Sequence, residues 1–118
     1  MNPIRLKYAH GRPRHTPGAM NKTEQAYSDY LTFLLRGGDI EWFKFEGIKL
    51  RLADKTFYTP DFFVMANDGT LEAHEVKGHW EDDAKVKIKV AAAMFPIKFI
   101  AIKPKAKKYG GGWEEEEF

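Results

Sequence analysis

Apolar residues recur at helical spacing in two stretches of the chain, and each stretch predicts a helix. The first begins near Asn21, ends at Gly37-Gly38 and predicts a helix of about 15 residues, with an apolar stripe formed by Tyr27, Tyr30, Leu31 and Leu34. The second ends before Pro96 and has a stripe formed by Ala84, Ile88, Ala91, Ala92 and Phe95. The sequence therefore predicts two amphipathic helices.

Shorter apolar runs predict four strands. Three precede the second helix and one follows it, at about 40–52, 56–65, 70–77 and 97–102. Gly47 indicates a bend within the first strand, and Asn67-Asp68-Gly69 is a hairpin turn signal between the second and third. The third and last strands are joined by a helix, so they should be parallel. We expect an α/β fold, a mixed β-sheet flanked by helices, with the order helix, three strands, helix, strand (αβββαβ).

One domain, residues 21–103, is predicted between two irregular ends. Residues 1–20 contain three Pro and two Gly and predict an arm. Residues 104–118 predict a tail that is basic and then acidic, and the segment from Lys103 through Gly110-Gly111-Gly112 predicts loose order. No apolar run is long enough to cross a bilayer, and the N-terminal residues lack the apolar stretch of a signal peptide, so we expect a cytosolic protein. The chain has no cysteine, so any bound metal needs oxygen or histidine ligands, which suits Mg²⁺ or Mn²⁺.

Charge is unevenly distributed. The net charge is +2, but four of the 17 acidic residues lie in the final EEEEF. The arm has no acidic residue and contains four basic ones that are candidate DNA contacts, Arg5, Lys7, Arg12 and Arg14. Basic ends around a compact middle are compatible with binding a phosphate backbone. The alternative is that basic tails only improve solubility.

The candidate chemistry lies on the second and third predicted strands. Asp61 follows Pro60, and Glu75-Val76-Lys77 ends the third strand. Glu75 and Lys77 are two residues apart, so they project from the same side of the sheet. Asp61 and Glu75 lie seven residues either side of Asp68, so a hairpin closed at this turn makes them cross-strand neighbours.

Two opposed carboxylates repel each other, and a divalent cation relieves this repulsion. Mg²⁺ held by one or two carboxylates, water and a substrate phosphate is common in phosphoryl-transfer sites. Lys77 would then orient or help deprotonate the attacking water, or stabilise the negative charge of the phosphorane, in phosphodiester hydrolysis. Each motif taken alone also has a structural interpretation. Asp61 alone is typical of a turn aspartate, and Glu75 with Lys77 is typical of a surface ion pair.

Glu24 is a third acidic candidate. At 100° per residue, it lies on the same helix stripe as Tyr27 and Leu31, which faces the core. An acid near the metal is one explanation. The other is a capping box, because Asn21 and Glu24 have the required spacing.

These motifs resemble the PD-(D/E)XK nuclease superfamily over residues 21–102. Within it, TPDFFV, EVKGHW and a Lys-rich helix are similar to small phage endonucleases of the Holliday junction resolvase type. The resemblance implies a restriction-endonuclease-like core and structure-selective DNA cleavage in a host cell's cytosol. It also implies that Asp61, Glu75 and the Val76 carbonyl bind Mg²⁺ or Mn²⁺, that Lys77 is the catalytic lysine, and that Glu24 is the helix-borne acid.

Some functions and contacts stay open. A nicking or sequence-specific endonuclease and a non-catalytic nucleic-acid-binding module are the alternatives. Trp80 has either a stacking or a packing role, and Lys85 with Lys89 either touches phosphate or forms a solvated face. His74 has the opposite strand parity to Glu75, which predicts a packing or surface role.

A homodimer is expected, because two symmetric cuts in a junction need two sites. The first helix and the strand aromatics Trp42, Phe43 and Phe45 either contribute to its interface or fill an ordinary core.

Overall fold

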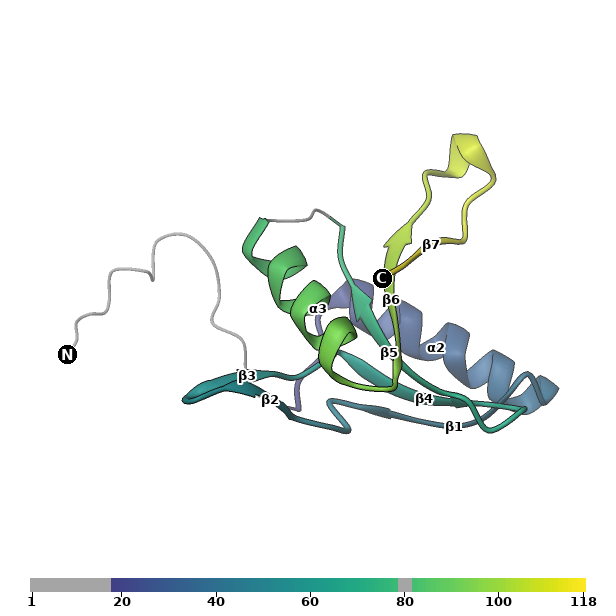
Figure 1. Cartoon of the computed structure of the whole chain (residues 1–118). Helices are drawn as coiled ribbons and strands as arrows, with labels where there is room; N and C mark the ends of the chain where they lie inside the picture. The colour runs from purple at the N-terminus through teal and green to yellow at the C-terminus, as the bar shows by residue number, and fades with distance from the viewer. Residues whose placement is uncertain (1–17, 79–81) are drawn as a thin grey trace.

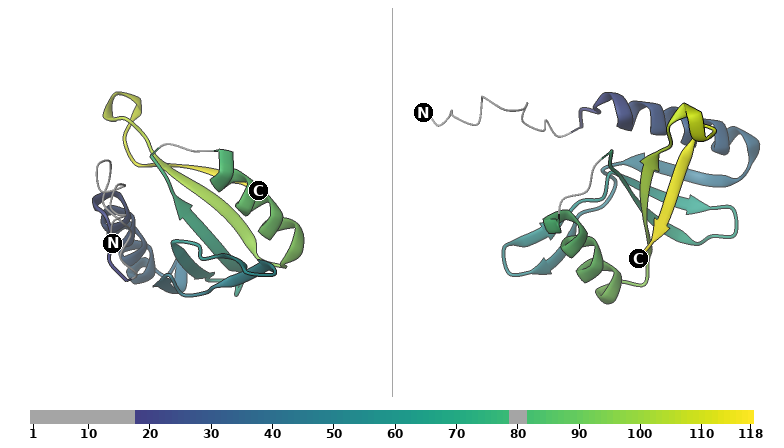
Figure 2. Two further views of the ribbon diagram at one scale, coloured as in Figure 1. Left: turned by 90° about the vertical axis from the view of Figure 1, so that its left-hand side faces the viewer. Right: turned by 90° about the horizontal axis from the view of Figure 1, so that it is seen from above.

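The computed structural model describes residues 18–78 and 82–118 and has an α/β fold. A five-stranded mixed sheet, in the order β1-β4-β5-β6-β7, lies between helices α2 and α3 (Figures 1 and 2). A separate two-stranded sheet, β2-β3, extends from one end (Figure 1). Within the described ranges, no helix has the length and apolar character that crossing a membrane requires.

The elements follow the chain in a regular succession. The helices are α2 (Lys22–Gly37), α3 (Asp82–Met94) and the short 3₁₀ helix η2 (Lys107–Tyr109). The strands are β1 (Ile40–Phe45), β2 (Leu50–Ala53), β3 (Thr56–Tyr58), β4 (Phe62–Ala66), β5 (Leu71–Val76), β6 (Lys98–Pro104) and β7 (Trp113–Glu117). Both predicted helices are confirmed.

Two predicted strands are each divided in two, so the order αβββαβ is not reproduced element by element. The predicted strand 40–52 bends at Glu46-Gly47, where Glu46 has φ 50° and a Cβ on Gly47 would lie 3.2 Å from the Lys44 carbonyl oxygen. The predicted strand 56–65 breaks at 59–61, because Pro60 has no N–H to donate to a strand ladder. The two breaks create the β2–β3 hairpin.

The predicted turn and strand directions are confirmed at the centre of the sheet. Ala66 N donates to the Thr70 carbonyl at 2.8 Å, and Thr70 N donates to Asp68 Oδ1 at 2.9 Å, which closes the turn between β4 and β5. Gly69 has φ 90°, a left-handed conformation that glycine tolerates. The β4–β5 pair is antiparallel and the β5–β6 pair is parallel.

Each face of the sheet has its own apolar cluster. Under α2 the buried side chains are Tyr27, Leu31, Ile40, Phe62, Val64, Val76, Ile100 and Ile102. Under α3 and the β2–β3 hairpin they are Leu50, Tyr58, Ala73, Ile88, Ala91 and Phe99. Strand residues alternate between the two clusters, as a sheet covered on both faces requires.

The C-terminal tail contains a strand that the sequence analysis did not predict, after the segment that was expected to be loosely ordered. Strand β7 pairs antiparallel with β6, and Phe118 N donates to the Phe99 carbonyl at 2.9 Å. The Trp113 ring packs edge-on to Tyr27, with 5.0 Å between ring centroids, and Lys98 Nζ lies 3.7 Å from Glu117 Oε1. Backbone pairing and this aromatic contact outweigh the low strand propensity of four consecutive glutamates.

Candidate functional site

Asp61 and Glu75 lie side by side between the end of β5 and the start of β4. Phe62 pairs with His74 across the two strands, so the same register places Asp61 opposite Glu75. The predicted cross-strand neighbours are therefore confirmed. Both are buried, with exposed fractions of 8% and 7%. Burying two carboxylates together costs free energy unless hydrogen bonds or cations compensate for the lost hydration and the repulsion. The pair therefore requires a structural or functional explanation.

Three groups hold the two carboxylates in place. The Val76 backbone N–H donates to Asp61 Oδ2 at 2.8 Å, and the Tyr58 hydroxyl donates to Glu75 Oε1 at 2.8 Å. Lys77 Nζ lies 3.3 Å from Glu75 Oε2, which confirms that Glu75 and Lys77 share one side of the sheet. Lys77 keeps a side-chain exposure of 37%, so its ammonium reaches solvent while its partner does not.

Asp61 has an unusually high pKa for an aspartate. Burial, and then the neighbouring charge of Glu75, raise its pKa to about 8. Burial also raises the pKa of Glu75, against the opposing effects of Lys77 and the Tyr58 hydroxyl. Asp61 is therefore largely protonated at neutral pH without a cation, and a divalent cation bound there would displace a proton.

Glu24 lies at the N-terminus of α2. Its Oε1 accepts from Asn21 N at 2.9 Å, and its own N–H donates to Asn21 Oδ1 at 2.8 Å, so the capping box is confirmed. It is nevertheless only 6% exposed, and its charge contributes to the raised pKa of Asp61. The cap and the position near Asp61 thus occur together.

The donor set suits a hard divalent cation. Among the described residues, no three histidine or acidic side chains form a metal-binding group, so Asp61 and Glu75 stand as a pair. Mg²⁺ commonly uses one or two carboxylates and completes its shell with water and substrate phosphate. Two adjacent buried carboxylates, one of them largely protonated without a cation, fit that requirement.

Tyr58 is the site residue that the sequence prediction missed. Its side chain is 8% exposed, and its pKa is raised by burial and then by the charge of Glu75. Its hydroxyl therefore stays protonated and keeps donating to Glu75. The only sequence signal was its place three residues before Asp61, and that spacing does not show which way the ring points.

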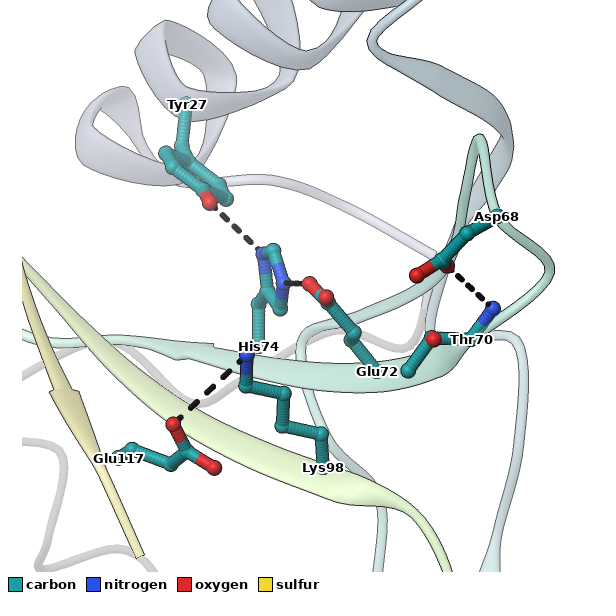
Figure 3. Close-up of polar contacts among 7 residues, drawn as sticks. All are labelled: Tyr27, Asp68, Thr70, Glu72, His74, Lys98 and Glu117. Atoms are coloured by element: carbon teal, nitrogen blue, oxygen red, sulfur yellow. Dashed lines mark hydrogen bonds and ion pairs between the residues drawn. The ribbon is translucent and has the colours of Figure 1, made fainter.

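His74, next to Glu75 in sequence, belongs to the opposite face of the sheet. The Tyr27 hydroxyl lies 2.7 Å from His74 Nδ1, and His74 Nε2 lies 2.8 Å from Glu72 Oε1 (Figure 3). Tyr27 and His74 are buried, so the predicted packing role is confirmed. This chain of polar contacts fastens α2 to β5. It thereby fixes Glu24, one turn before Tyr27, relative to the carboxylate pair.

The predicted DNA contacts divide into two groups. Arg5, Lys7, Arg12, Arg14 and Trp80 lie outside the described residues. Lys85 and Lys89 are on α3, where Lys85 is half-buried and Lys89 is exposed. Their contact with phosphate stays a prediction.

Comparison with protein-family models, curated proteins and solved structures gives no match for this chain. Function is therefore inferred from the side chains and their geometry.

Proposed function

We propose that this protein is a metal-dependent DNA endonuclease, and that Asp61, Glu75 and Lys77 form the site at which it hydrolyses phosphodiester bonds. One observation is decisive for the proposal: two buried carboxylates lie side by side with a half-exposed lysine paired to one of them. Asp61 and Glu75 would hold Mg²⁺ or Mn²⁺, with the Val76 carbonyl as a further ligand. The bound ion would supply Lewis-acid stabilisation of charge on the scissile phosphate.

The chain's own groups have separable roles in this proposal. Tyr58 fixes the orientation of the Glu75 carboxylate through its 2.8 Å hydrogen bond. Lys77 is tethered by the same carboxylate, so its ammonium is held at the solvent boundary, where it can orient a water molecule and stabilise negative charge. Glu24 would add a third acid at the edge of the pair.

The succession of elements supports a PD-(D/E)XK-like core. With the β2–β3 hairpin regarded as an insertion and η2 and β7 as a C-terminal addition, the chain runs α2, β1, β4, β5, α3, β6, which is helix, three strands, helix, strand. Asp61 then precedes the second of these strands, and Glu75 and Lys77 flank the end of the third. The motif resemblance extends the proposal to branched DNA as the preferred substrate.

A substrate panel tests the function. The purified protein is incubated with end-labelled duplex, single-stranded, flap and four-way junction DNA, with Mg²⁺, Mn²⁺ or EDTA. We expect internal cuts with either metal, none in EDTA, and faster cleavage of the junction or flap than of the duplex. Products that shorten only from an end would indicate an exonuclease. No cleavage of any substrate with either metal would refute the proposal.

We further propose that the working form is a homodimer, which would supply two cleavage sites. Phe43 and Phe45 pack against the α2-side cluster, as an ordinary core requires, so only Trp42 of the three strand aromatics is left for an interface. Trp42 is 41% exposed on the edge strand β1, and its ring packs edge-on to Phe63.

Light scattering after size exclusion tests the dimer. We expect about twice the 13.6 kDa chain mass, and a shift toward the single-chain mass for Trp42→Ala. Tyr109→Ala is the matched control, because Tyr109 is an exposed aromatic on η2, between β6 and β7 at the opposite edge of the sheet from β1. A single-chain mass for the wild type at all micromolar concentrations would rule out the dimer.

A further inference from the structure

The β2–β3 hairpin has two different faces. Leu50 pairs with Tyr58 across it, and both are buried in the cluster under α3. Arg51 pairs with Phe57, and both are exposed. Because side chains alternate along a strand, Arg51 and Phe57 project from the face that points away from that cluster. We call this the outer face of the hairpin.

The outer face combines an aromatic ring with cations. Phe57 is 41% exposed even though Lys49 Nζ lies 4.5 Å from the centroid of its ring. The hairpin has one acid, Asp54, whose Oδ1 lies 3.3 Å from Arg51 Nη2. Both side chains of that pair are highly exposed, at 63% and 81%, so the pair is weak and can exchange for a phosphate.

The hairpin is anchored to the candidate site through its inner face. Tyr58, which follows Phe57 directly, donates its hydroxyl to Glu75 at 2.8 Å. From the other side, Lys87 Nζ of α3 donates to the Phe57 carbonyl at 3.3 Å. Figure 1 shows the hairpin extending beyond the five-stranded sheet, alongside α3. A ligand on the outer face therefore lies on the hairpin that positions Glu75, across that hairpin from the carboxylate pair.

We propose that the outer face of the hairpin binds an unpaired segment of the DNA substrate, on the side of the hairpin away from the carboxylate pair. Phe57 stacks on a base, while Lys49 and Arg51 contact the flanking phosphates. Exposed aromatics interleaved with cations bind single strands in this way, because every unpaired base has a free π-face whereas bases in a duplex are already stacked. This inference rests on the proposed nuclease function and narrows its substrate to DNA with an unpaired segment.

Binding without cleavage tests the hairpin. Fluorescence anisotropy in EDTA measures the affinity of the full chain for labelled single-stranded, flap and duplex DNA. Phe57→Ala should weaken binding to the single strand and the flap about tenfold while leaving duplex binding unchanged. Arg51→Ala should flatten the slope of log K against log salt for the single strand by about 0.7. Phe57→Ala should leave that slope unchanged.

Two residues on α2 serve as matched controls. Phe33→Ala removes a ring that is 71% exposed, and Arg36→Ala removes an exposed cation from the last turn of the helix. Both should bind every DNA like the wild type. Phe57→Leu keeps an apolar side chain on the hairpin, so a similar loss of affinity with an unchanged thermal melt identifies stacking, and not unfolding, as the cause.

Cross-linking locates the contact directly. A single strand containing bromouracil, irradiated with the wild-type protein, should attach to the peptide that contains Phe57. Wild-type affinity of the Phe57 and Arg51 variants, a cross-link elsewhere, or no DNA binding by the wild type would overturn the proposal. Hairpin-dependent binding without cleavage in any metal would retain the contact and refute the nuclease function. If the wild type cleaves DNA and its hairpin variants bind DNA normally, the nuclease function is retained and the hairpin contact is refuted.

Discussion

Replacing Lys77 with alanine is expected to slow DNA cleavage by a factor of about 100 or more, because a charge aimed at the reacting phosphate is worth that much in a preorganised site. Asp61→Asn and Glu75→Gln should have effects at least as large, because each removes half of the carboxylate pair. The measurement is single-turnover cleavage at saturating protein, which separates chemistry from binding. Lys103→Ala, an exposed lysine on β6, is the matched control and should keep the wild-type rate.

The fold should survive these substitutions, since Lys77 is half-exposed and both carboxylates have near-isosteric amides. A far-UV spectrum and a thermal melt of each variant check this. A correctly folded Lys77→Ala protein that cleaves at the wild-type rate would show that the lysine belongs to a structural ion pair and not to the reaction.

Glu24→Gln separates the two roles of Glu24. Glutamine can still accept the hydrogen bond from Asn21 N, so the capping box and the stability of α2 should be retained. The negative charge near Asp61 is lost. A large drop in the single-turnover rate with an unchanged melt would identify Glu24 as an active-site acid, whereas an unchanged rate would leave it as a cap.

The stability of the metal-free protein should fall as pH rises from about 4 to about 8. The pKa of Asp61 is about 8 in the folded chain and 3.8 as its ordinary value. Between these values the folded state binds more protons than the unfolded state, so the free energy of unfolding decreases with rising pH. The contribution is fully present below the lower value and is lost as pH rises through the higher one. Glu75, whose pKa is also raised, acts in the same direction.

Urea unfolding in EDTA at several pH values measures this dependence. Asp61→Asn should show a much shallower decline, and at pH 8 it should be more stable than the wild type by several kcal/mol. Mg²⁺ should stabilise the wild type at pH 8 more than the variant. Asp39→Asn, an exposed aspartate beyond the end of α2, should follow the wild-type curve. Parallel curves for Asp61→Asn and the wild type would contradict the raised pKa.

The carboxylate pair was predictable from sequence because its geometry is local. A short turn at Asn67–Gly69 fixes the register of β4 and β5, and side chains then alternate with a period of two, so the positions of Asp61, Glu75 and Lys77 follow. The two helices were equally predictable, since apolar periodicity lies within each segment and a local signal, Gly37-Gly38 or Pro96, marks where each helix ends.

Tyr58 and β7 were not predictable for the opposite reason. The contact of Tyr58 with Glu75 depends on the backbone bend at Glu46-Gly47 and on the break at Pro60, which together detach β2–β3 from the main sheet. Strand β7 depends on an open edge of β6 and on the packing of Trp113 against Tyr27, contacts that no local pattern in a run of glutamates reveals.

The polar chain from Tyr27 through His74 to Glu72 has a consequence for how the protein opens. If α2 lifted from the sheet, the Tyr27 hydroxyl and the His74 ring would each lose a partner, at a cost of about 1–3 kcal/mol per stranded group if water did not enter. Admitting water would mean breaking the apolar cluster around them. We therefore expect the amides of α2 and β5, including those of Glu24 and Glu75, to exchange slowly and together, as one cooperative unit.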